Sequence, residues 1–196
     1  MNLAPIIPQR RTEPTTDPAW AVELKLDGFR GLADTIRGKM LSKNLKPLKR
    51  FQPLLDTLPL DCVFDGEICV LDQDGRPNFN ALLFGRGGPV YIVFDLLFYE
   101  RKDIRSLPLK ERRAILDQVA ARCGVQKSEL FTGCAKKLYD TVCAMDLEGI
   151  VLKKLDDPYD AERTKWWKIC STPNIRRKSV AGNCSRGERD RCRDGR

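Results

Sequence analysis

The feature that most constrains the fold is a set of short segments in which apolar and charged residues alternate. In the clearest one, residues 21–27, every second residue is charged: Glu23, Lys25 and Asp27. Successive side chains of a β-strand point to opposite faces of the sheet. The alternation therefore predicts a strand that carries three charged side chains on one face.

Further strands are predicted from the same alternation or from continuous apolar runs. They lie within residues 31–41 and at residues 62–71, 90–98, 149–155 and 165–170. Apolar residues at helical spacing predict two longer helices, at residues 109–123 and 135–145. Shorter helical pieces are expected at residues 80–84 and, broken by Pro47 and Pro53, within residues 45–58. Because strands dominate and the helices are inserted irregularly, we predict an α+β fold with antiparallel sheets.

Composition limits both the class of protein and its chemistry. A length of 196 residues with 42% hydrophobic residues suits one globular domain with an appendage. The chain has no histidine, which excludes Ser-His-Asp catalysis, Cys-His catalysis and Cys/His zinc sites. None of the eight cysteines forms a C-x-x-C pair, and neither a signal peptide nor a membrane-spanning run is apparent. These features favour a reduced, cytosolic protein with free thiols.

The chain divides into three parts by composition and charge. Residues 1–19 are rich in Pro, Thr and Arg and are expected to form an N-terminal arm, and residues 20–170 form the patterned domain. Residues 171–196 hold eight Lys/Arg and three Asp/Glu, so they contribute +5 of the net charge of +8. This segment has no periodic apolar face, and we predict a basic, disordered tail.

Five short motifs carry residues that are able to do chemistry. They are Glu23-Leu24-Lys25-Leu26-Asp27-Gly28-Phe29-Arg30, Asp65-Gly66-Glu67, Phe94-Asp95-Leu96-Leu97, Glu148-Gly149-Ile150-Val151-Leu152-Lys153 and Trp166-Trp167-Lys168. Taken singly, each has an ordinary structural explanation, such as a solvated lysine, a turn or a core strand. Their order and spacing within one domain are much more specific.

Together these motifs resemble the nucleotidyltransferase motifs of ATP-dependent DNA ligases, over residues 20–169. Compact bacterial ligases of the end-joining type are the most similar group. The resemblance implies an ATP-grasp-like adenylation domain that acts in DNA repair and recombination, with ATP and Mg²⁺ or Mn²⁺ as cofactors. It also implies nicked double-stranded DNA as the partner, a monomeric state, no membrane contact, and a location in the bacterial cytosol near the nucleoid.

The resemblance further implies a role for each of eight residues. Lys25 would be the catalytic nucleophile that carries AMP, and Glu148 would bind the divalent metal ion. The others would hold the nucleotide: Glu23 at the adenine edge, Arg30 at the ribose or the substrate phosphate, Glu67 at the ribose hydroxyl, Phe94 stacked on adenine, and Lys153 and Lys168 at the phosphates.

The chemistry of a lysyl phosphoramidate is consistent with this set. A neutral amine must attack the α-phosphorus, whereas free lysine has a pKa of about 10.4. Cations nearby disfavour a second positive charge and stabilise the transferring phosphoryl group, and Arg30 and Lys168 are candidates. Glu148 and Lys153 are five residues apart, so a regular strand would point them to opposite faces. A bulge, or a position of Glu148 in the loop before the strand, would bring them together.

The chain departs from the family pattern in three places. Ser42-Lys43 stands where the family has Ser-Arg, and Cys170 replaces the last lysine of the closing motif. Residues 171–196 cannot build the OB-fold that follows this domain in the family, so we expect that domain to be absent and the chain to be truncated. Reduced or partial ligase activity is expected, with adenylation surviving better than nick sealing.

Two other hypotheses stay open at this stage. RNA ligases and capping enzymes share the lysine motif, although the motifs at Phe94 and Glu148 are more similar to those of DNA ligases. A non-catalytic nucleotide- or DNA-binding remnant is the alternative from a different class, because of Cys170 and the expected absence of the OB-fold.

Overall fold

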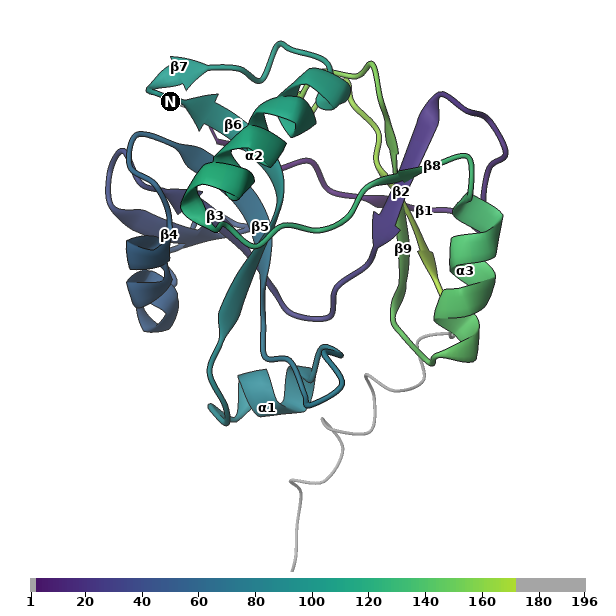
Figure 1. Ribbon diagram of the computed structural model, residues 1–196, viewed down its shortest axis with the longest axis horizontal. Coiled ribbons are helices and arrows are strands. Elements are labelled where there is room, and N and C mark those ends of the chain that lie inside the picture. The colour runs from purple at the N-terminus through teal and green to yellow at the C-terminus, as the bar shows by residue number, and fades with distance from the viewer. Residues whose placement is uncertain (1–2, 172–196) are drawn as a thin grey trace, which may run out of the picture.

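The structure is a computed structural model that describes residues 3–171, and two five-stranded sheets form its frame (Figure 1). Sheet A has the order β1 (Gln9–Arg10), β10 (Trp167–Cys170), β9 (Gly149–Lys154), β2 (Trp20–Leu24) and β8 (Phe131–Thr132). Sheet B has the order β4 (Lys39–Ser42), β3 (Phe29–Asp34), β5 (Val63–Cys69), β6 (Val90–Tyr99) and β7 (Lys102–Asp103). All pairs are antiparallel except β1 with β10, which is parallel. The predicted fold class, α+β with antiparallel sheets and inserted helices, is confirmed.

Within the described residues, four helices join these strands. They are a 3₁₀ helix η1 (Lys49–Thr57), α1 (Phe79–Leu83), α2 (Leu109–Cys123) and α3 (Ala135–Ala144). Helix α2 lies over sheet B, and α3 packs against sheet A (Figure 1). Where short helical pieces broken by Pro47 and Pro53 were expected within residues 45–58, one 3₁₀ helix forms with Pro53 inside it. Within residues 3–171, no helix has the length and apolar character needed to cross a bilayer.

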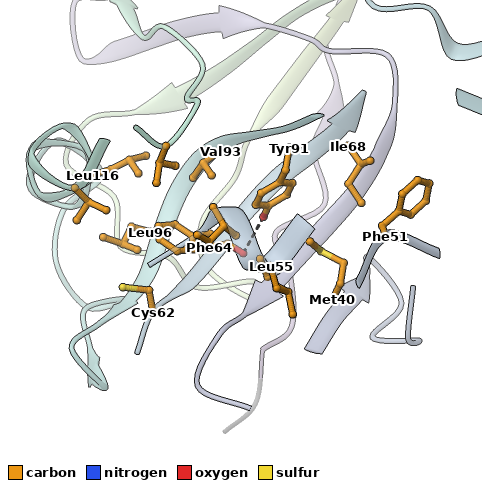
Figure 2. Packing of buried hydrophobic residues seen from close by; sticks show 14 of the residues in the cluster. Met40, Phe51, Leu55, Cys62, Phe64, Ile68, Tyr91, Val93, Leu96 and Leu116 are labelled. Carbon is orange, nitrogen blue, oxygen red and sulfur yellow. Dashed lines mark hydrogen bonds between the residues drawn. The ribbon is translucent and has the colours of Figure 1, made fainter. Parts of the chain in front are cut away.

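The largest core cluster fills the space between sheet B and its covering helices (Figure 2). Phe64 and Leu96 from the sheet pack there with Leu116 of α2, all of them buried. The Tyr91 hydroxyl finds hydrogen-bond acceptors inside this core, because its proton lies between the carbonyl oxygens of Gly31 at 2.8 Å and Phe64 at 3.2 Å. Burial of this apolar surface is the main stabilisation of sheet B, at roughly 25 cal/mol per Å².

A second cluster lies where the two sheets face one another. It contains Leu32 and Leu97 from sheet B and Val151 from sheet A, together with Trp166. A third cluster, which includes Val22 and Val142, joins the opposite face of sheet A to α3. The two sheets are thus held together by side chains from both, and the cleft described below opens beside this contact.

The segment predicted as an arm packs against the domain along part of its length. Leu3 and Ile6 are buried in the cluster between the sheets, and β1 adds a parallel strand to the edge of sheet A. Of the predicted basic tail, 171–196, only Ser171 belongs to the residues that the structure describes.

Candidate active site

A cleft of about 350 Å³ opens between the two sheets. Seven of the eight residues singled out in the sequence line it: Glu23, Lys25, Arg30, Glu67, Phe94, Glu148 and Lys168. The eighth, Lys153, does not line the cleft but is buried next to Glu23. The fold therefore gathers the predicted site residues in one place, although they come from distant parts of the chain.

Lys25 lies just beyond the end of β2, and its side chain pairs with Glu148. Its Nζ is 2.6 Å from Glu148 Oε1, and both side chains are about one fifth exposed. The backbone N–H of Lys25 donates to the Gly149 carbonyl at 2.9 Å, which extends the pairing with β9 by one residue. The strand predicted to reach residue 27 ends at Leu24, because the chain leaves sheet A there and enters sheet B at Phe29.

Glu148 lies in the loop that precedes β9, one of the two arrangements expected from the sequence, and it lines the cleft, whereas Lys153 on β9 does not. Gly149 begins the strand with a φ of 152°. A Cβ at this position would lie 2.1 Å from the Ile169 carbonyl oxygen, so only glycine fits. The residue before this tightly packed glycine is Glu148, whose side chain pairs with Lys25.

Glu67 stands on β5 directly across from Arg30 on β3. Burial raises the pKa of Glu67 to about 8; Lys25 and Arg30 oppose the shift, whereas Glu148 and Asp65 reinforce it. At neutral pH this carboxyl group is mostly protonated and is able to donate a hydrogen bond. A protonated acid next to a lysine is a group that is ready to bind hydroxyls in the cleft.

Arg30 is held by several partners at once. Its guanidinium forms a two-pronged contact with Asp65, at 2.9 Å from Nε and 2.6 Å from Nη2. It also donates to the Ile6 carbonyl at 2.5 Å and to the Tyr159 hydroxyl at 3.3 Å. The Tyr159 hydroxyl in turn donates to Asp65 at 2.6 Å. Arg30 thus fastens the N-terminal segment to sheet B at the rim of the cleft, and its predicted contact with ribose or phosphate stays a prediction.

Glu23 and Lys153 form a buried ion pair behind the cleft, from β2 and β9. Lys153 Nζ also lies 4.4 Å from the centre of the Phe94 ring and 4.0 Å from that of the Trp166 ring. Burial lowers the pKa of Lys153, and the charges of Glu23 and Asp95 oppose this effect. The Lys153 amine is well placed to hold Glu23, Phe94 and Trp166 in position. Its predicted contact with phosphate stays a prediction.

Phe94 and Lys168 complete the walls of the cleft. The Phe94 ring meets Trp166 edge to face, with centroids 5.9 Å apart, and Arg30 lies 5.3 Å from the ring. Lys168 is partly buried on β10, and its carbonyl accepts from the Arg11 N–H at 3.0 Å. One aromatic wall and one cationic wall suit a ligand with a flat base and a charged phosphate end.

Two residues with contacts to this site escaped the sequence analysis. Ser128 donates to Glu23 Oε2 at 3.0 Å, and Tyr159 holds Arg30 with Asp65. Ser128 lies 105 residues from Glu23 along the chain, and Tyr159 lies 94 from Asp65. No local pattern marks either residue, so their roles depend on the fold alone.

The arrangement also fits a divalent cation shared with a phosphate ligand. Magnesium is commonly held by one or two carboxylates, with phosphate oxygens and water completing its shell. Glu148 offers such a carboxylate at the mouth of the cleft. Within residues 3–171 no cluster of three or more His, Cys, Asp or Glu side chains is placed to hold a metal ion.

Comparison with known proteins gives matches over most of the chain. The family model described as ATP dependent DNA ligase domain matches residues 7–169. The multifunctional non-homologous end joining protein LigD of Pseudomonas aeruginosa is 34% identical over 163 residues, which are 76% of this chain and 19% of that protein. The SPbeta prophage-derived DNA ligase-like protein LigB of Bacillus subtilis is 28% identical over 182 residues, 86% of this chain and 67% of that protein.

Solved structures share the fold. The ligase domain of Mycobacterium tuberculosis LigD superposes with a TM-score of 0.72 at 24% identity, over 85% of this chain and 58% of that one. A mycobacterial DNA ligase D complexed with ATP and MES gives a TM-score of 0.73 at 24% identity, over 86% of this chain and 60% of that one. This chain thus spans about three fifths of these structures and about a fifth of the Pseudomonas protein.

Proposed function

The chain belongs to the family of ATP-dependent DNA ligase domains, and from this premise we propose that it is a ligase core that captures AMP on Lys25. The observation that carries the proposal is the Lys25 amine, 2.6 Å from Glu148, in a cleft with Glu67, Phe94 and Lys168. A primary amine beside a carboxylate, with an aromatic wall and a second cation, is what nucleotidyl transfer to lysine needs.

In the first step Lys25 Nζ attacks the α-phosphorus of ATP. A P–N bond forms, the bond from the α-phosphorus to the oxygen that bridges to the β-phosphate breaks, and pyrophosphate leaves with the electron pair. The amine loses its proton, and Glu148 Oε1 is close enough to accept it. Lys168 stabilises charge on the phosphoryl oxygens, while Phe94 and Glu67 position the base and the ribose.

In the later steps AMP passes from Lys25 to the 5′-phosphate of a DNA nick, and the 3′-hydroxyl then displaces AMP to form the phosphodiester. A magnesium or manganese ion bound at Glu148 would neutralise phosphate charge. Repair of broken DNA in the bacterial cytosol is the setting we propose, and the names of the related proteins support it.

Incubation of the whole chain with α-labelled ATP and magnesium tests the first step. We expect a covalent label that resists denaturation, is absent in Lys25→Ala, and is unchanged in Lys102→Ala, an exposed lysine on β7. No label at saturating ATP would contradict the proposal and favour a non-catalytic, nucleotide-binding protein.

The substrate of the later steps is tested with protein that has already been labelled. Nicked DNA and nicked RNA duplexes are supplied separately, and transfer of AMP to each 5′-phosphate is measured. We expect transfer to nicked DNA. Transfer only to nicked RNA would make the chain an RNA ligase of the same superfamily.

A further inference from the structure

Tyr159 lies in the loop that joins β9 to β10, and backbone hydrogen bonds hold this loop from two sides. The first two N–H groups of α2 donate to the carbonyls of Asp157 and Leu155, each at 2.9 Å. The N–H of Tyr159 itself donates to the Arg105 carbonyl at 2.7 Å. The first N–H groups of a helix have no partner inside the helix, so the loop satisfies them as a cap would. The place of Tyr159 is therefore set by the backbone around it.

The Tyr159 side chain extends from this loop into the interior, and only 5% of the residue is exposed. Its ring meets Trp166 edge to face, with centroids 5.7 Å apart, and the Arg112 guanidinium lies 5.7 Å from the ring centre. Arg112 is itself fixed by Asp95, which accepts from Nε and from Nη2 at 2.8 Å each. The ring is thus confined by two fixed neighbours, and so is the hydroxyl that it carries.

The Tyr159 hydroxyl joins three segments that are far apart in the sequence. It donates to Asp65 Oδ2 at 2.6 Å, and it accepts from Arg30 Nη2 at 3.3 Å and from the Ile6 N–H at 3.4 Å. Burial and the charge of Asp65 raise the pKa of Tyr159, so the hydroxyl keeps the proton that it donates. Strand β5, strand β3 and the N-terminal segment therefore meet at one oxygen atom.

The contacts of Arg30 leave one donor for a ligand. A guanidinium carries five N–H donors in one plane. Nε and one proton of Nη2 are donated to Asp65, the other Nη2 proton to Tyr159, and one proton of Nη1 to the Ile6 carbonyl. Within residues 3–171, no acceptor takes the second Nη1 proton. Because Arg30 lines the cleft, this proton is available to an oxygen of a bound ligand.

We propose that Tyr159 is a positioning residue that acts through Arg30 on the ligand in the cleft. The proposal rests on the function proposed above and deepens it. The hydroxyl occupies one Nη2 proton and also binds the Asp65 oxygen that Nη2 contacts, so it braces both partners of this ion pair. Because the guanidinium is planar and rigid, a fixed Nη2 also fixes the direction of the remaining Nη1 donor.

Tyr159→Phe tests the proposal on the whole chain, because it keeps the ring and removes only the hydroxyl. Two reactions are followed: labelling by ATP, and transfer of AMP from labelled protein to nicked DNA. Arg30→Lys identifies the ligand that Arg30 contacts, as the one whose half-saturating concentration rises. We expect Tyr159→Phe to raise the same half-saturating concentration by about ten-fold, the size of one buried hydrogen bond, and to leave both maximal rates and the other ligand within about two-fold.

Tyr99→Phe is the matched control, because the Tyr99 hydroxyl also meets an arginine, Arg122 at 2.7 Å, but lies outside the cleft. It should alter neither reaction. Tyr159→Phe combined with Arg30→Lys separates positioning from a general structural role. The double variant should behave like Arg30→Lys alone, since the group that Tyr159 directs has been removed.

Three results overturn the proposal. One is a Tyr159→Phe variant with unchanged values in both reactions. Another is an Arg30→Lys variant with unchanged values, because Tyr159 would then have nothing to act through. The third is an equal loss in both reactions that multiplies with the effect of Arg30→Lys, because a structural defect is independent of the guanidinium. Absence of any label with the wild-type protein instead contradicts the proposed function, so the two failures are distinguishable.

If Tyr159→Phe does not fold, nitrogen-15 NMR of the arginine side chains decides on the wild-type protein, with Arg30→Lys to assign the Arg30 signals. A guanidinium held at both Nη groups rotates slowly about its C–N bonds and gives separate Nη proton signals. We expect separate signals that shift when ATP or nicked DNA is added. One averaged signal, or separate signals that neither ligand shifts, overturns the proposal.

Discussion

At the scale of single residues, Glu67 is a side chain whose protonation is altered by its position in the fold. Burial raises the pKa of Glu67 from 4.5 to about 8. Between these values the folded protein holds a proton that the unfolded chain has lost, so the contribution of Glu67 to stability falls as pH rises from about 4.5 to about 8.

Glu67→Gln, which keeps the shape of the protonated acid, should remove this dependence. We expect the variant to be more stable than the wild type at pH 8 by at least about 1 kcal/mol, since one pKa unit corresponds to 1.36 kcal/mol, with little difference at pH 5. Urea unfolding at both values measures the change. Glu129→Gln removes an exposed carboxylate and serves as the control; parallel pH profiles for wild type and Glu67→Gln would show that the pKa of Glu67 is not raised.

At the scale of secondary structure elements, Gly149 controls the start of β9. A methyl group there would lie 2.1 Å from the Ile169 carbonyl, and the φ of 152° is itself strained for other residues. We expect Gly149→Ala to destabilise the fold by about 2 kcal/mol or more and to move Glu148 away from Lys25.

Urea unfolding and the labelling assay together check this prediction. Gly88→Ala is the matched control, because a Cβ at Gly88 meets no atom within 4 Å. A Gly149→Ala variant with normal stability and normal labelling would show that this turn does not position Glu148.

Some elements were predictable from the sequence because their patterns are local. The helix expected at residues 109–123 forms with those bounds, since its periodic apolar residues face the sheet and Gly124 caps its end with a φ of 69°. The strand expected to continue to residue 27 stops at Leu24, because alternation does not reveal where a chain changes sheets. The end of β2 is set instead by its pairing with β9, which is distant in sequence.

The candidate site shows the same division. Lys25 and Glu148 were identifiable because each belongs to a recurring short motif, and the fold brings them to 2.6 Å. Ser128 and Tyr159 were not identifiable, because a single serine or tyrosine carries no signal and its partners are far along the chain. Which residues support a site depends on packing that only the folded chain reveals.

At the scale of the whole molecule, the N-terminal segment helps to hold the two sheets together. Ile6 is 1% exposed among Leu32, Leu97 and Trp166, whereas the next residue, Ile7, is 58% exposed. We expect Ile6→Ala to lower the free energy of unfolding by about 2–5 kcal/mol, as for other buried large-to-small changes.

Ile7→Ala provides the comparison for this prediction, because it deletes the same number of atoms from the neighbouring residue. Its free energy of unfolding should change by less than about 0.5 kcal/mol, the usual range for surface positions. Denaturant unfolding of both variants measures the difference. Equal effects would mean that the segment does not contribute to the core between the sheets.

The pairing of β2 with β9 has a consequence for the order in which the molecule is assembled. Every strand of sheet B lies between residues 29 and 103. In sheet A, by contrast, Leu24 of β2 pairs with Ile150 of β9, which is far away along the chain. Contacts between residues so far apart in sequence form late in folding, because the entropy of closing a long loop is lost before the contacts stabilise the structure. During synthesis on the ribosome, Lys25 is made 123 residues before Glu148, so the two side chains meet only after that long stretch has been synthesised. Pulsed hydrogen exchange during refolding should protect amides of β5 before those of β2, and nucleotide binding should appear last.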